Sequence, residues 1–156
     1  MTNRNGIDQI YRVPFGGGQP VLMVEGGGLP LESWDGGSLY YVCGPSRRAQ
    51  IGAGIGHSAQ SLCVRPLTGG VKTEVIDPIT DGTFAIGREG VYYIGKRTAD
   101  GVFALEFFDS ATSRSRQLGI VREPGMGLSV SPDGSIAYTV RTVAALSDLR
   151  LVEPLR

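Results

Sequence analysis

Short apolar runs separated by glycine, proline, aspartate and asparagine follow one another along the whole chain. Runs of this length that are rich in Val, Ile, Tyr and Phe and bounded by turn residues are typical of β-strands. A helix-friendly pattern is confined to the single turn at 143–146. We therefore predict an all-β chain with thirteen strands, at 9–14, 21–24, 29–33, 39–43, 61–66, 72–76, 83–86, 90–94, 103–108, 114–119, 127–130, 136–140 and 148–152.

A unit made of a short strand, a tight turn and an aromatic strand recurs in the sequence. Residues 33–41 (SWDGGSLYY) match residues 131–138 (SPDGSIAY), and a degenerate copy lies at 87–93 (GREGVYY). The aromatic strands are 52 and 45 positions apart, counted from Tyr41 to Tyr93 and from Tyr93 to Tyr138. A four-stranded propeller blade takes roughly 40–50 residues. This spacing predicts a partial β-propeller of about three four-stranded antiparallel blades.

The turn chemistry supports this interpretation. In the turn at 131–134, Pro132 presets φ, Asp133 bonds nearby backbone and Gly134 tolerates a positive φ. We expect the other two turns to form as well, because both copies retain the glycine of the motif, as Gly36 and Gly90. The paired aromatics place one ring on each face of a blade, and we expect both faces to be buried; they are Tyr40, Tyr41, Tyr92, Tyr93, Phe107 and Phe108.

Composition excludes several classes of protein. Glycine occurs 24 times, about twice the usual ~7%, which suits many turns. The 15 Lys and Arg residues balance 15 Asp and Glu residues, so we expect no nucleic-acid partner. No run reaches the ~18 apolar residues that span a bilayer, and residues 1–9 lack the apolar core of a signal peptide. For the chain as given we expect no membrane association and a cytoplasmic location, or a periplasmic one if a longer parent protein contains it.

The repeats resemble the TolB-type propellers, bacterial WD-like repeats with a Ser-Pro-Asp-Gly turn before an aromatic strand. The stretches that carry this resemblance are 90–93, 106–109, 127–134 and 147–153. The resemblance covers the chain from about Gln9 onward and implies a propeller of the kind found behind winged-helix or kinase modules. It also implies six or more blades and a final blade that ends after its third strand.

This comparison sets the expected domain organisation. We predict a single partial propeller over 1–156, with blade repeats at about 27–76, 82–119 and 126–152, a remnant of a preceding blade at 8–25 and a long loop at 44–60. Met1 is then expected within a blade and Arg156 at a genuine terminus, so the chain forms the C-terminal half of a propeller. A protein partner, missing blades, or a second copy that closes a six-bladed ring would complete the propeller. The alternative is that the propeller is not completed.

No residue pattern specifies a reaction. His57 is the only histidine, and no Gly-x-Ser-x-Gly elbow accompanies it. The run Gly52-x-Gly54-x-Gly56 is followed by a strand, whereas a phosphate-binding loop leads into a helix. We therefore predict no catalytic residue, no cofactor and no metal ligand.

The remaining candidates concern binding and redox chemistry. Arg47, Arg48 and His57 in the long loop, together with Trp34 at a turn, form a candidate interaction surface. Cys43 and Cys63 flank that loop on strands expected to be neighbours. They either pair as a disulfide, which would imply an oxidising compartment, or stay two thiols of which one packs as a small hydrophobic group.

The architecture favours a non-catalytic interaction or sensor module within a larger bacterial propeller protein. Two alternatives stay open. The chain is an accessory propeller of a prolyl-oligopeptidase-like hydrolase, or it is a truncated remnant without an independent function.

Overall fold

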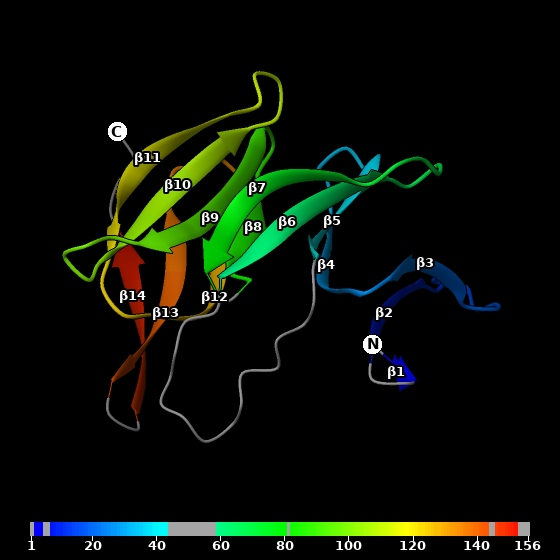
Figure 1. Ribbon diagram of the computed structural model, residues 1–156, viewed down its shortest axis with the longest axis horizontal. Coiled ribbons are helices and arrows are strands. Elements are labelled where there is room, and N and C mark those ends of the chain that lie inside the picture. Colours follow the sequence, from blue (N-terminus) through cyan, green and yellow to red (C-terminus); the bar gives the residue numbers. More distant parts are fainter. Residues whose placement is uncertain (1, 5–6, 44–58, 81, 144–145, 153–156) are drawn as a thin grey trace.

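The computed structural model describes residues 2–4, 7–43, 59–80, 82–143 and 146–152, and these residues form strands and turns without a helix (Figure 1). The strands are β1 Thr2–Arg4, β2 Ile7–Arg12, β3 Val21–Glu25, β4 Gly27–Glu32, β5 Ser38–Cys43, β6 Ala59–Pro66, β7 Thr73–Thr80, β8 Phe84–Ile86, β9 Gly90–Arg97, β10 Phe103–Asp109, β11 Arg114–Val121, β12 Pro124–Val130, β13 Ala137–Val143 and β14 Leu146–Val152. The predicted all-β class is confirmed. The described part of the chain holds no helix with the length and apolarity needed to cross a membrane.

The strands form four antiparallel sheets in which sequence neighbours pair side by side. We name them the N-terminal sheet (β1–β3), the first blade (β4–β7), the second blade (β8–β11) and the third blade (β12–β14). The innermost strand of the second blade, β8, contacts both β4 and β12, which are the innermost strands of its two neighbours. In a propeller, the sheets are arranged around a central axis, and the first strand of each sheet lies nearest to that axis. The predicted partial β-propeller is therefore confirmed (Figure 1).

The N-terminal sheet has one more strand than the sequence pattern indicated. β1 pairs with β2 in register Asn3↔Asp8, and β2 pairs in turn with β3. The residues of β1, Thr2–Arg4, are polar, so no apolar alternation marks them as a strand; they are placed by backbone pairing at a sheet edge. Three strands therefore precede the first blade, where two were predicted. Closure of a ring by a second copy stays a prediction.

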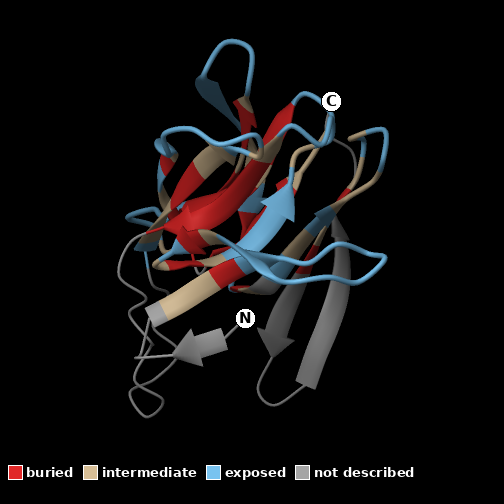
Figure 2. Ribbon diagram, turned by 90° about the vertical axis from the view of Figure 1, so that its right-hand side faces the viewer, coloured by how far each residue is buried: buried red, intermediate tan, exposed pale blue. Residues whose placement is uncertain are grey.

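The hydrophobic core lies between the sheets, in three layers. Tyr40, Val42 and Leu62 of the first blade pack against Val91 and Phe108 of the second. The opposite face of the first blade meets the N-terminal sheet, and the second blade meets the third in the same manner. Figure 2 shows the buried residues concentrated in the middle of the strands. The first and second blades are thus each held by a neighbour on both faces.

Alternation along the second strand of each blade produces these layers. Tyr40 faces the second blade, whereas Tyr41 faces the N-terminal sheet, because successive side chains point to opposite faces. Tyr93, Phe107 and Phe108 are also buried, as predicted. Tyr92 is the exception, since it is only partly buried and lines an open groove at the edge of the second blade.

Candidate binding surface at the blade turns

The turn between β4 and β5 is held by one serine and one aspartate. The Ser33 hydroxyl donates to the Asp35 carboxylate at 2.6 Å and accepts the Ser38 N–H at 2.9 Å. The same carboxylate accepts the Gly37 N–H at 3.0 Å. Gly36, with φ of 69°, donates its N–H to the carbonyl of Ser33 at 2.9 Å. The side chains therefore supply hydrogen bonds that a bare turn would lack.

The turn between β12 and β13 repeats this network. The Ser131 hydroxyl donates to Asp133 at 2.5 Å and accepts the Ile136 N–H at 3.0 Å. Asp133 accepts the Ser135 N–H at 3.1 Å, and Gly134 has φ of 72°. The motif match between residues 33–38 and 131–136 is thus a match of hydrogen bonds as well as of letters.

These bonds shift an acid equilibrium and give a prediction. Hydrogen bonds from the Ser131 and Ser135 side chains and the Ser135 N–H lower the pKa of Asp133 from 3.8 to about 2. As the pH falls, Asp133 therefore takes up its proton at a higher pH in the unfolded chain than in the folded one. Ionised Asp133 stabilises the fold above about pH 4, and this contribution is lost as the pH falls to about 2. We expect the urea midpoint of the native protein to fall more steeply across this window than that of Asp133→Asn.

The control for this experiment is Asp100→Asn, which removes a negative charge from the exposed turn between β9 and β10. Its midpoint should fall as steeply as that of the native protein. Parallel profiles for Asp133→Asn and the native protein would contradict the role given to Asp133.

The turn between β8 and β9 is shorter than the other two. The Gly87 N–H donates to the Gly90 carbonyl at 2.8 Å, and Arg88 and Glu89 form the exposed tip. The turn forms as expected, but Gly90 does not have the positive φ that Gly36 and Gly134 have in the other two turns. Gly90 begins β9, where a Cβ would lie 1.9 Å from the carbonyl oxygen of Phe108. Position 90 therefore requires glycine, because the backbone of β10 approaches it too closely for a Cβ.

Trp34 projects from the first of these turns. Its side chain is 51% exposed, and the Arg88 guanidinium of the next turn lies 5.4 Å from its ring centroid. A guanidinium over an indole face is a favourable cation–π contact. Trp34 and Arg88 therefore form one patch across the first and second blades.

A groove of about 420 Å³ opens beside this patch, between the second blade and the β12–β13 turn. We call it the turn groove; it is lined by Arg88, Glu89, Tyr92, Phe107, Arg116, Pro132, Asp133 and Gly134. The rings of Tyr92 and Phe107 lie 4.8 Å apart, and the Tyr92 hydroxyl donates to the Gly134 carbonyl at 3.3 Å. The Arg116 guanidinium lies 5.3 Å from the Phe107 ring centroid. The groove thus has aromatic walls and charged edges.

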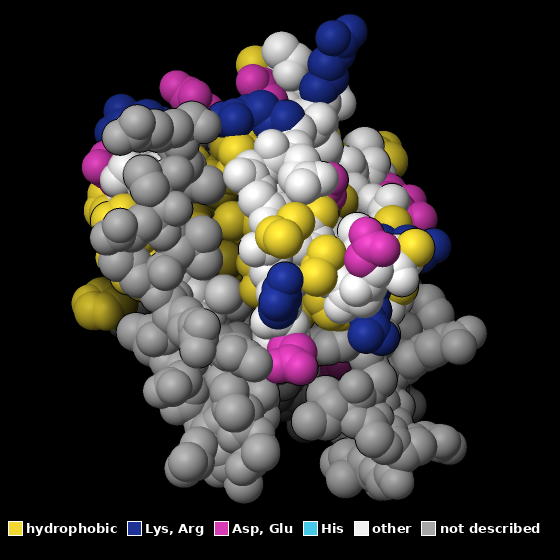
Figure 3. All heavy atoms as spheres, turned by 90° about the vertical axis from the view of Figure 1, so that its left-hand side faces the viewer, with side chains coloured by type: hydrophobic (Ala, Val, Ile, Leu, Met, Phe, Trp, Pro, Cys, Tyr) yellow, Lys and Arg dark blue, Asp and Glu magenta, His cyan; other side chains and the backbone are white. Residues whose placement is uncertain are grey.

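The electrostatics of the groove are mixed. Burial is the largest cause that raises the pKa of Tyr92, Glu89 and Asp133 raise it further, and Arg116 opposes them. Tyr92 therefore stays a neutral hydrogen-bond donor at physiological pH. Basic and acidic side chains also lie among hydrophobic ones on the face shown in Figure 3. The groove therefore presents charges of both signs, and no single sign dominates.

The groove chemistry suits binding. A guanidinium stacked on a ring uses its face and leaves its N–H groups, which lie in its plane, directed to the sides. Arg88 and Arg116 each lie over an aromatic ring, with the guanidinium carbon 5.4 Å and 5.3 Å from the ring centroid. Arginine of this kind donates well to carboxylates and carbonyls. Aromatic rings between two such groups provide an apolar contact for a neighbouring side chain.

A second hollow lies on the propeller axis. It measures about 260 Å³ and is lined by the innermost strands, with Leu31, Glu32, Ala85, Ile86, Leu128, Ser129 and Val130. Its lining is mostly aliphatic, and Glu32 supplies its carboxylate.

Comparison with solved structures identifies the architecture. TolB from Acinetobacter baumannii superposes with a TM-score of 0.68 over 93% of this chain, at 11% identity. The fold is that of a TolB-type propeller. A candidate TolB from Agrobacterium tumefaciens gives a TM-score of 0.67 over 93% of the chain, at 18% identity. The chain spans 35% and 51% of the lengths of these two proteins. No protein-family model and no curated protein matches the sequence.

Within the TolB-type fold, the candidate interaction residues fall into two groups. Arg47, Arg48 and His57 lie outside the described residues. Trp34 lies in the described turn between β4 and β5. The structure brings Trp34 together with Arg88 of the second blade, a residue that the sequence did not single out.

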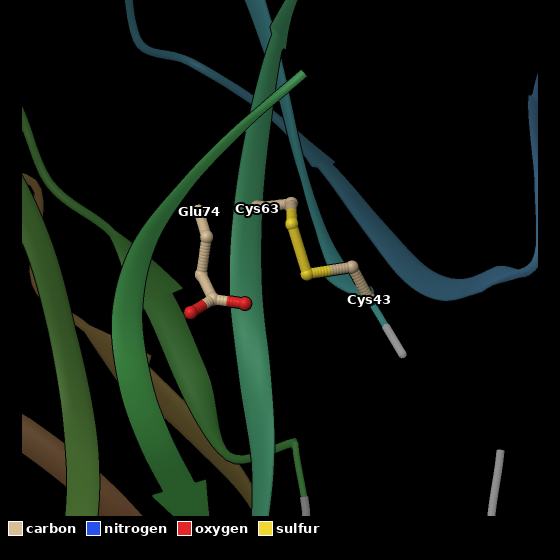
Figure 4. A group of neighbouring side chains, drawn as sticks. All are labelled: Cys43, Cys63 and Glu74. Carbon is tan, nitrogen blue, oxygen red and sulfur yellow. A yellow bond between two sulfur atoms is a disulfide. The ribbon is translucent and has the colours of Figure 1, made fainter. Parts of the chain in front are cut away.

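The two cysteines are joined in the structure. Cys43 on β5 and Cys63 on β6 form a disulfide with a Cα–Cα distance of 5.7 Å. They are diagonal neighbours, because Cys43 pairs with Ser61 and Cys63 pairs with Tyr41. Figure 4 shows the carboxylate of Glu74 turned toward the sulfur atoms from β7. The sequence pattern does not connect Glu74 with the cysteines, because Glu74 reaches Cys63 through strand pairing.

Several residues that line the turn groove have only a weak pattern in the sequence. In the sequence, Arg88 and Glu89 stand only as departures of the degenerate copy from the turn motif, although they form its exposed tip. Arg116 belongs to β11, whose exposed, polar residues gave no reason to distinguish one arginine from another. The repeat itself could have indicated them, since turns at equivalent positions of neighbouring blades lie side by side.

Proposed function

We propose that the chain is a non-catalytic interaction module that binds an acidic segment of a polypeptide partner in the turn groove, next to Trp34. The observation that carries the proposal is the pair of guanidinium groups, Arg88 and Arg116, which both line the turn groove and each lie over an aromatic ring. Tryptophan, tyrosine and arginine are the residues that dominate binding energy at protein interfaces.

The acid–base properties of the groove support binding rather than catalysis. A general acid or base works best with a pKa near the operating pH. The pKa of Asp133 is about 2, and its oxygens are engaged by the hydrogen bonds of its own turn. Tyr92 has its pKa raised by burial, so it too keeps one protonation state near neutrality.

An acidic ligand is favoured by the geometry of the charges. The N–H groups of Arg88 and Arg116 can each donate to a carboxylate at the groove edge. Asp133 is committed to its turn, which reduces its capacity to compete for them. An aromatic or aliphatic residue beside the acid would contact Phe107 and Tyr92, which line the same groove as the two arginines.

Peptide selection tests the proposal. A random-peptide library is selected on the immobilised full chain, and the dissociation constant of each selected peptide is measured by fluorescence anisotropy. We expect acidic peptides, and at least tenfold weaker binding to Trp34→Ala and to Arg116→Ala, since an interface anchor contributes on the order of 2 kcal/mol. Binding should also weaken with salt.

The matched control is Arg122→Ala. Arg122 is an exposed arginine that follows β11 at the end opposite to Arg114, so it lies away from the turn groove. Its substitution removes the same charge and should leave the affinity unchanged. Peptides that bind Trp34→Ala and Arg116→Ala as tightly as the native protein would reject the groove as the contact, provided that the variants keep the native unfolding temperature.

A further inference from the structure

Two sulfur atoms and one carboxylate converge on one face of the first blade. Cys43, Cys63 and Glu74 come from the adjacent strands β5, β6 and β7, and Cys63 and Glu74 are direct partners in the ladder. Their donor atoms all lie within 4.8 Å of one another. Figure 4 shows the Glu74 carboxylate beside the disulfide that joins Cys43 and Cys63.

The surroundings divide this cluster into a dry side and an open side. Cys43 and Cys63 are 5% and 1% exposed and pack with Ile10 and Val24 of the N-terminal sheet. Glu74 is exposed. Arg65 lies two residues beyond Cys63 on β6, and its guanidinium donates to the Met23 carbonyl of the N-terminal sheet. A cation on the same strand face partly offsets the negative charge of nearby thiolates.

Reduction of the disulfide would change what this cluster can bind. A dithiol reductant transfers two electrons and two protons, so that the S–S bond breaks, two thiols form and the reductant closes to its own disulfide. Burial and the Glu74 carboxylate both disfavour thiolates at these positions. A divalent cation removes that penalty, because it replaces the two thiol protons and is attracted by all three anionic donors.

We propose that the reduced chain binds a zinc-type divalent cation through Cys43 Sγ, Cys63 Sγ and a Glu74 carboxylate oxygen, with a fourth position open to water. Zinc is held by thiolates at about 2.3 Å and by carboxylates at about 2.0–2.2 Å, in a tetrahedron. The sulfurs then separate to about 3.8 Å, which rotation about the Cα–Cβ bonds can supply. The oxidation state of the cysteine pair decides whether the site exists.

Cobalt titration tests this proposal. The full chain is reduced with a phosphine, desalted without oxygen and titrated with Co²⁺, which replaces zinc and absorbs visible light in a tetrahedral site. We expect one equivalent to bind, with sulfur-to-cobalt charge-transfer absorption and tetrahedral visible bands, and we expect Zn²⁺ to bleach both. The disulfide form should show neither signal. A reduced chain with two reactive thiols and no cobalt spectrum overturns the proposal.

Two substitutions separate the site from adventitious thiol binding. Glu74→Gln should weaken Co²⁺ binding at least tenfold and leave the sulfur absorption at saturation, whereas Cys63→Ser should abolish the spectrum. Glu32→Gln, which changes an exposed glutamate on β4, should have no effect. Co²⁺ binding that is insensitive to Glu74→Gln overturns the proposal. This outcome includes the case in which reduction unfolds the chain and cobalt binds the thiols of the unfolded protein.

Discussion

Replacing Gly90 with alanine is expected to lower the free energy of unfolding by about 3 kcal/mol or more, the upper range for an overpacked site. The new Cβ would lie 1.9 Å from the Phe108 carbonyl oxygen and 3.0 Å from the Phe107 ring. The oxygen belongs to the backbone of β10, which pairs with β9 at Asp109↔Gly90, so it cannot move without opening the ladder. Relief of the contact therefore costs hydrogen bonds or core packing.

Gly119→Ala provides the matched control for this measurement. Gly119 also lies in a strand of the second blade, β11, but a Cβ at this position meets nothing within 4 Å. Urea unfolding followed by circular dichroism should show Gly119→Ala near the native midpoint and Gly90→Ala far below it, or already unfolded. Equal midpoints would mean that β9 and β10 can separate at low cost.

Removal of the disulfide is the second large effect that we expect. The bond joins residues 20 positions apart, so it restricts the unfolded chain by closing a long loop. A loop of this size corresponds to about 3 kcal/mol in the chain-entropy account. The double substitution Cys43→Ala and Cys63→Ala should lower the free energy of unfolding by that amount. It should also make the urea midpoint insensitive to reductant.

The native chain in reductant, with metal removed by a chelator, is the comparison for the double variant. Both should unfold near the same urea concentration, below that of the oxidised native protein. A native midpoint that does not change on reduction would show that the bond does not stabilise the fold, or that the cysteines are already thiols in the purified protein. Counting thiols under denaturing conditions distinguishes these two cases.

Much of the architecture could be predicted because short-range chemistry decides it. Alternation in 38–43 and 90–97 determines which ring faces which neighbour, and the Ser-x-Asp-Gly turns contain their own hydrogen-bond partners. These features are visible within a few residues of sequence. The propeller follows from them once their spacing is known.

The remaining features arise from pairing between segments that are distant in sequence. β1 is polar and is placed by its partner β2, and Gly90 is required by a carbonyl of β10. Glu74 lies near the cysteines because of the β6–β7 register, and Arg88 of the second blade contacts Trp34 of the adjacent first blade. None of these contacts has a local pattern, so they become visible only when the strands are in register.

The stacking of sheets gives the molecule an unequal distribution of local stability. Each core layer joins only two adjacent sheets, so the first and second blades have packed neighbours on both sides. In such quasi-one-dimensional arrays, opening can begin at an end without disturbing the middle. Amide hydrogens of β5 and β9 should therefore exchange with solvent deuterium more slowly than those of β2, although all three belong to regular antiparallel ladders.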